Sequence, residues 1–176
     1  MKKIISQILL VACLVLLTGC GGISIPTEDG GTVNFTKDGF TVEGTDGSKG
    51  TYSTDKDGGF VIESDDGSEL KFGEDLELPE GYPEDILPLY QEESIITTSS
   101  ADGGFYIMYI SGATANDCTE FYKELVEDIE GKTITTSDSG AMIFANISGK
   151  ECAVMITTES TEEDKASVSL TIGTEQ

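Results

Sequence analysis

The sequence contains no histidine, no arginine and no tryptophan among its 176 residues. Histidine is the usual general base, a common metal ligand and the side chain that titrates near neutral pH. Arginine supplies the bidentate clamp for phosphates and carboxylates. Their absence argues against triad hydrolases, histidine-ligated zinc enzymes and most phosphoryl-transfer enzymes. A glycosidase, which needs only two carboxylates, stays open, but no motif localises such a pair.

Positive charge is also scarce, with 10 Lys against 33 Asp and Glu and a formal net charge of −23. Such a field repels nucleic acid and anionic lipid headgroups, so we expect no nucleic-acid partner. It attracts cations or a basic partner. Solubility outside the cell is the simplest explanation for such a surface.

Long apolar runs are limited to one, Ile4 to Leu17, which follows Lys2 and Lys3. It is shorter than the ~20 residues of a membrane-spanning helix and has the layout of a secretory signal. We therefore expect residues 1–19 to be a signal peptide.

The run ends in Leu17-Thr18-Gly19-Cys20, which resembles the lipobox of bacterial lipoproteins. The resemblance implies cleavage before Cys20 and a diacylglyceryl group on its sulfur, with residues 20–29 as a flexible tether. Two acyl chains suffice for stable anchoring. The protein is then held on the outer face of the cytoplasmic membrane or at the cell surface. An ordinary cleaved signal peptide and an uncut anchor are the alternatives.

Cysteines are few, and Cys13 and Cys20 belong to the leader and the anchor. Cys118 and Cys152 remain, in a setting where a disulfide can persist. A bridge between them closes a loop of about 35 residues and contributes ~3.5–4 kcal/mol by the chain-entropy estimate. Two buried free thiols are the alternative. A redox role is not indicated, since the sequence has no CxxC motif.

Residues 30–77 alternate short apolar pairs, spaced at i and i+2, with Asp-Gly dipeptides. The spacing predicts strands with one apolar face, and Asp-Gly favours hairpin turns. We expect an acidic β-meander of short antiparallel strands. A repeating solenoid and partial disorder are the competing interpretations.

The segment "STDKDGGFVIES", residues 53 to 64, partly follows the calcium loop of an EF-hand. Asp55, Asp57 and Gly58 occupy its third, fifth and sixth positions, but Ser64 stands where a bidentate Glu is required. We expect no cofactor, and weak Ca²⁺ binding by Asp55, Asp57, Asp65 and Asp66 is the one alternative. The simpler interpretation is that these carboxylates form turns.

Residues 78–90 hold three of the four prolines and predict a hinge. From 91 to 176 the pattern predicts two strands, an amphipathic helix over 114–131 with Thr114 near its start, and four further strands. We therefore expect an α+β fold in which one helix packs on an antiparallel sheet, a ββα-ββββ layer following the meander. "YP", "LPLY" and "FYKEL", between Pro79 and Leu125, loosely resemble secreted domains of uncharacterised lipoproteins, which implies no known activity.

Together these features predict a lipid-anchored, extracytoplasmic binding or accessory module of the cell envelope that is not an enzyme. Its expected partners are the membrane, through Cys20, and an envelope protein or an extracellular ligand. The first alternative is an envelope protein whose Asp-Gly turns bind calcium, and the second is a carboxylate-only glycosidase.

Overall fold

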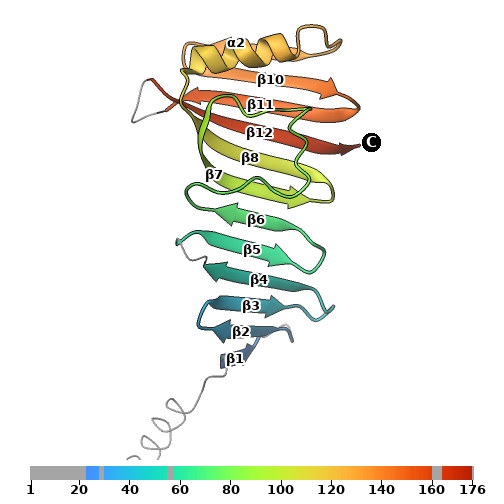
Figure 1. The fold of residues 1–176 in the computed structure, drawn as a ribbon. Coiled ribbons are helices and arrows are strands. Elements are labelled where there is room, and N and C mark those ends of the chain that lie inside the picture. Colours follow the sequence, from blue (N-terminus) through green and yellow to red (C-terminus); the bar gives the residue numbers. More distant parts are fainter. Residues whose placement is uncertain (1–22, 28–29, 55–57, 160–163, 176) are drawn as a thin grey trace, which may run out of the picture. The chain divides into compact units, whose positions relative to one another are not determined.

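The computed structural model describes residues 23–27, 30–54, 58–159 and 164–175 (Figure 1). The chain divides into two compact units between Thr51 and Tyr52. The expected signal peptide and Cys20 lie outside the described residues. The division differs from the expected boundary at residues 78–90, which belong wholly to the second unit.

The first unit contains β1 (Ile23–Pro26), β2 (Thr32–Thr36) and β3 (Gly39–Glu43), which pair antiparallel in chain order. Partners that lie directly opposite one another share a face. One face therefore carries only apolar side chains: Ile23, Ile25, Val33, Phe35, Phe40 and Val42. Ile23 and Ile25 are 62% and 49% exposed. β2 and β3 are antiparallel strands within the meander expected in residues 30–77, whereas β1 lies in residues 20–29, which the sequence predicted to be a flexible tether.

β4 (Lys49–Thr54) crosses the division, and the strands of the second unit begin with β5 (Phe60–Ser64) and β6 (Glu69–Phe72). They are followed by β7 (Glu92–Ala101), β8 (Gly104–Ser111), β9 (Thr133–Ser137), β10 (Gly140–Ile147), β11 (Lys150–Thr158) and β12 (Ala166–Glu175). The spatial order is β5-β6-β7-β8-β12-β11-β10-β9, and every pair is antiparallel. β12 pairs with β8, so the chain leaves β8, reaches the far edge at β9 and returns strand by strand.

The predicted α+β class is wrong, because the protein is mostly antiparallel β-sheet. Twelve strands and a single helix, α2 (Ala115–Leu125, 11 residues), make up the regular structure of the described residues. Phe72 of β6 pairs with Thr97 of β7, which lies beyond residues 78–90. One sheet therefore continues past the prolines.

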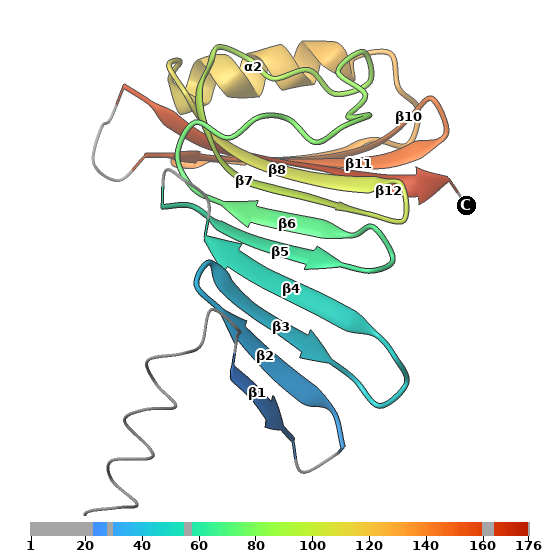
Figure 2. The same ribbon diagram turned by 60° about the horizontal axis from the view of Figure 1, so that its bottom comes forward.

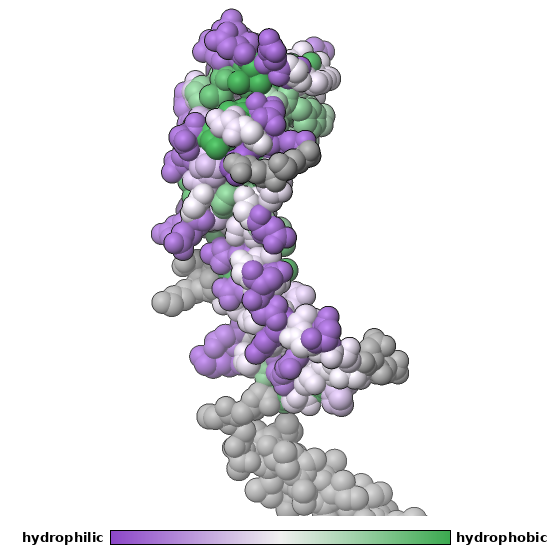
Figure 3. All heavy atoms as spheres, turned by 90° about the vertical axis from the view of Figure 1, so that its right-hand side faces the viewer, coloured by the Kyte–Doolittle hydropathy of each residue, from purple (hydrophilic) through white to green (hydrophobic). Residues whose placement is uncertain are grey.

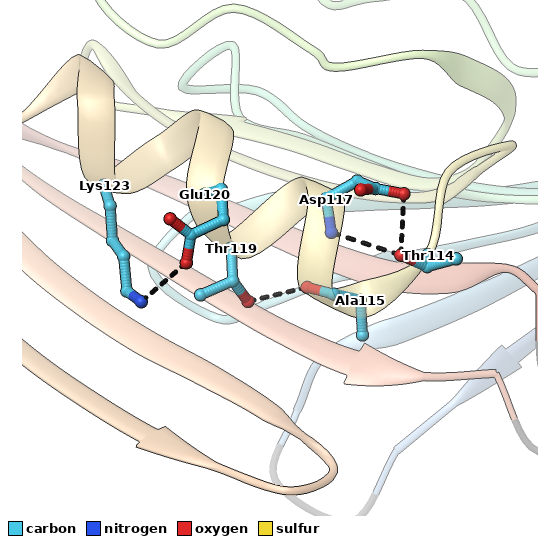
Figure 4. A network of polar contacts seen from close by, with 6 residues as sticks. All are labelled: Thr114, Ala115, Asp117, Thr119, Glu120 and Lys123. Carbon is cyan, nitrogen blue, oxygen red and sulfur yellow. Dashed lines mark hydrogen bonds and ion pairs between the residues drawn. The ribbon is translucent and has the colours of Figure 1, made fainter.

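α2 begins where the sequence predicts. The Thr114 hydroxyl accepts a hydrogen bond from the Asp117 backbone N–H at 3.2 Å and donates one to the Asp117 carboxylate at 2.7 Å (Figure 4). Helix formation ends at Leu125, earlier than the expected stop at Gly131. None of the helical structure in the described part of the chain has the length and apolar character of a membrane span.

The core lies between the sheet and a cover formed by α2 and residues 73–91 (Figure 2). Leu87 and Tyr122 are fully buried. The Tyr82 hydroxyl donates to the Leu87 carbonyl at 2.7 Å, and the Tyr122 hydroxyl donates to the Pro88 carbonyl at 2.8 Å. The segment predicted to be a hinge is therefore a part of the core, because its aromatic and aliphatic side chains bury apolar surface against the sheet.

Candidate functional site

The side of the second-unit sheet that faces away from α2 carries a continuous band without charge. Strand register places directly opposite residues on one face, so each row of partners can be followed from strand to strand. The first row, from β5 to β9, is Phe60, Phe72, Thr97, Met108, Ser169, Met155, Met142 and Thr135. The second row is Ile62, Leu70, Ser99, Tyr106, Thr171, Ala153, Phe144 and Thr133.

A shorter third row, from β7 to β9, contains Ser94, Ile110, Ser167, Thr157, Gly140 and Ser137. We call these three rows the open face. They contain only apolar and hydroxyl-bearing residues and glycine, whereas the whole chain has a net charge of −23. None of the residues in the three rows of the open face is charged.

Large apolar side chains stand exposed on the open face. Met142, Phe144 and Met155 are 43%, 46% and 46% exposed, and Phe72 at the other end is 43% exposed. The small Ser169 between them is only 7% exposed, because Met108 and Met155 flank it. The other side of the same strands is the core, where Ile143, Val154 and Leu170 are at most 3% exposed. Figure 3 looks onto one set of strand ends, where apolar residues, in green, lie among hydrophilic ones, in purple.

Carboxylates border the open face along both of its long sides. At the Ser111 end of β8 lies a pocket of about 690 Å³ lined by Glu74, Asp75, Glu93, Ser94, Ile96, Ile110, Glu159 and Lys165. Its one ammonium group, on Lys165, contacts Glu93 at 3.0 Å. We call this the acidic border pocket. At the opposite strand ends lie Asp66, Asp102 and Glu151.

The calcium hypothesis rests on four carboxylates, of which Asp55 and Asp57 lie outside the described residues. Asp66 accepts a hydrogen bond from the Ser68 backbone N–H at 2.8 Å, which lowers the pKa of its carboxyl. Gly67 has φ +87°, and the Ser64 and Ser68 backbones close the turn. Asp65 and Asp66 therefore lie in a hairpin turn, and weak Ca²⁺ binding stays a prediction. No group of three potential metal ligands occurs among the residues that the structure describes.

Cys118 and Cys152 are both buried in the core, and the structure has them as free thiols. The Cys152 thiol donates a weak hydrogen bond to the Lys150 carbonyl, at 3.6 Å. Burial raises the pKa of each thiol, so neither is an activated nucleophile. The bridge is not formed in this structure and stays a prediction.

Sequence reasoning missed the open face, although its signal is present. In β10, Met142 and Phe144 alternate with the core residues Ala141, Ile143 and Ala145. A strand that is apolar on both faces predicts that other elements cover both of its faces. α2 and residues 73–91 both lie on the core side, however. Comparisons with protein-family models, curated proteins and solved structures found no match to the chain.

Proposed function

We propose that the protein is a non-enzymatic binding module, anchored outside the cell by lipid on Cys20, whose open face docks another protein of the envelope. The observation that carries this proposal is the uncharged open face, with exposed Phe and Met side chains, in a chain with a net charge of −23. Uncovered apolar surface of this extent costs free energy in water and marks interaction sites.

The anchor is supported by the apolar run and the Leu17-Thr18-Gly19-Cys20 motif. It holds the module beside the membrane surface, where envelope proteins meet it at high local concentration. The absence of histidine and arginine supports a role in binding over one in catalysis.

Site-specific photocrosslinking in living cells tests the proposal. A photoreactive amino acid at Phe144 should give one discrete protein adduct, because that side chain is 46% exposed on the open face. The same amino acid at Glu120, exposed on the outer side of α2, is the control and should give none.

Two variants test the docking surface and the lipid anchor separately. Met155→Asp, which places a charge beside Phe144, should abolish the adduct while leaving the protein folded. Cys20→Ser should release the protein from the membrane fraction. No adduct from Phe144, or equal adducts from both positions, would overturn the docking function.

A further inference from the structure

The chemistry of the partner follows from the shape of the open face and the charge around it. Neighbouring strands lie about 4.8 Å apart, so eight strands span roughly 34 Å across the sheet. Residues two apart in a strand are separated by about 6.7 Å, so three rows span only ~13 Å along the strands. The open face is therefore a strip.

Those dimensions fit one α-helix lying across the strands. A helix with its side chains is about 10–12 Å wide, and ~23 residues span 34 Å. On its other side the same sheet carries α2, which runs along the strands (Figure 1) and buries Cys118 and Tyr122 over the core residues. The exposed side chains of Met142, Phe144 and Met155 supply apolar contact surface at one end of the strip.

The charge of the helix follows from the borders of the strip. Both long sides carry carboxylates, and the acidic border pocket sets four of them against the single Lys165. A helix with an apolar stripe flanked by lysine or arginine places its positive charges beside the carboxylates on the two long sides. A second copy of this chain does not fit, because each copy has a net charge of −23 and would bring its own carboxylate borders, or Glu120 and Glu124 of α2, against carboxylates.

Resting on the proposed docking function, we infer that the partner covers the open face with a basic amphipathic helix. Its apolar stripe packs on Met142, Phe144 and Met155 at one end of the strip and on Phe60 and Phe72 at the other. Its basic side chains contact Glu74, Glu93 and Glu159 on one side and Glu151 on the other.

Binding of synthetic helical peptides to the full chain in zwitterionic lipid nanodiscs tests this inference, with empty nanodiscs as the blank. The probe is a Leu/Lys peptide with one apolar stripe. One comparison peptide has Glu in place of every Lys, and a second has the Leu/Lys sequence scrambled so that the stripe is lost. The Leu/Lys peptide should bind at least about tenfold more tightly than either, and more weakly as salt is added.

Two variants with the same added charge locate the site. Phe144→Asp should weaken binding at least about fivefold, although its extra negative charge attracts the peptide. Asn116→Asp on α2, away from the open face, is the matched control and should bind like the unaltered chain. Circular dichroism of both variants without peptide checks that the fold is kept.

Each of the following outcomes would contradict one part of the inference. Equal binding of the scrambled peptide means unspecific attraction to an acidic chain, and equal binding of the Glu peptide removes the charge argument. If no peptide binds while Phe144 still captures a protein in cells, the basic helix is wrong and the docking function stands. A dimer in which Phe144 crosslinks to a second copy would assign the strip to self-association.

Discussion

At the scale of single residues, buried tyrosine hydroxyls form hydrogen bonds between the elements that enclose the core. The hydroxyls of Tyr109 and Tyr122 lie 2.9 Å apart, and the Tyr90 backbone N–H donates to Tyr109 at 3.0 Å. Burial raises the pKa of Tyr109 from 10.0 to about 12, and it also raises the pKa values of Tyr82 and Tyr122. These groups join strand β8, helix α2 and the proline-rich segment.

Their titration predicts the behaviour of the protein in alkali. In the folded state these hydroxyls keep their protons to a higher pH than in the unfolded chain. The stability that they contribute is therefore complete below pH 10 and is lost as pH rises from 10 toward 12 for Tyr109. Each buried tyrosine should lower the free energy of unfolding by about 1.4 kcal/mol per pH unit in that window. Urea unfolding across the window measures the slope.

Tyr122→Phe removes one titrating group and should make that slope shallower. At neutral pH the substitution should lower the free energy of unfolding by about 1–3 kcal/mol, because the partly buried Pro88 carbonyl loses its donor. Tyr90→Phe is the control, since its hydroxyl contacts only the exposed Gln91 side chain in the described structure. An unchanged slope in Tyr122→Phe would contradict the assignment.

At the scale of elements, α2 shows how a short helix is fixed in a protein of strands. Thr114 and Asp117 satisfy each other at its first turn, and the Lys123 ammonium lies 2.9 Å from Glu120 (Figure 4). At the other end, Lys132 donates to the Glu127 carbonyl at 2.6 Å. The exposed pair with Lys123 contributes little, whereas the cap removes an unsatisfied N–H.

Thr114→Ala should therefore lower the free energy of unfolding by about 1 kcal/mol. Thr114→Ser keeps the hydroxyl and should stay within a few tenths of the unaltered chain. Urea denaturation of the two variants side by side makes the comparison. Equal stability of both would mean that packing of Tyr122 and Val126 alone holds the helix.

At the scale of the whole molecule, repulsion between the carboxylates lowers the stability of the folded state. A net charge of −23 opposes compaction, and salt screens it. We expect the melting temperature to rise with sodium chloride, and to rise equally with Mg²⁺ and Ca²⁺ at matched ionic strength. The reason is that Asp66 is already bonded within its turn. Thermal unfolding of the purified chain checks this. A rise of several degrees that is specific to Ca²⁺ would support the calcium-binding alternative instead.

The sequence by itself determined the local features. The alternation of 30–77 sets the one-sided strands, Asp-Gly sets the turn at Gly67, and Thr114 sets the start of α2, because each depends on residues a few positions apart. Only the tertiary structure decided that β6 pairs with β7, that residues 78–90 cover the core, and that β12 pairs with β8 and aligns Ser169 with Met108. These depend on which edges and faces meet across long separations. The local spacing of residues does not determine which strands pair. The open face could therefore be recognised only from the register of the paired strands.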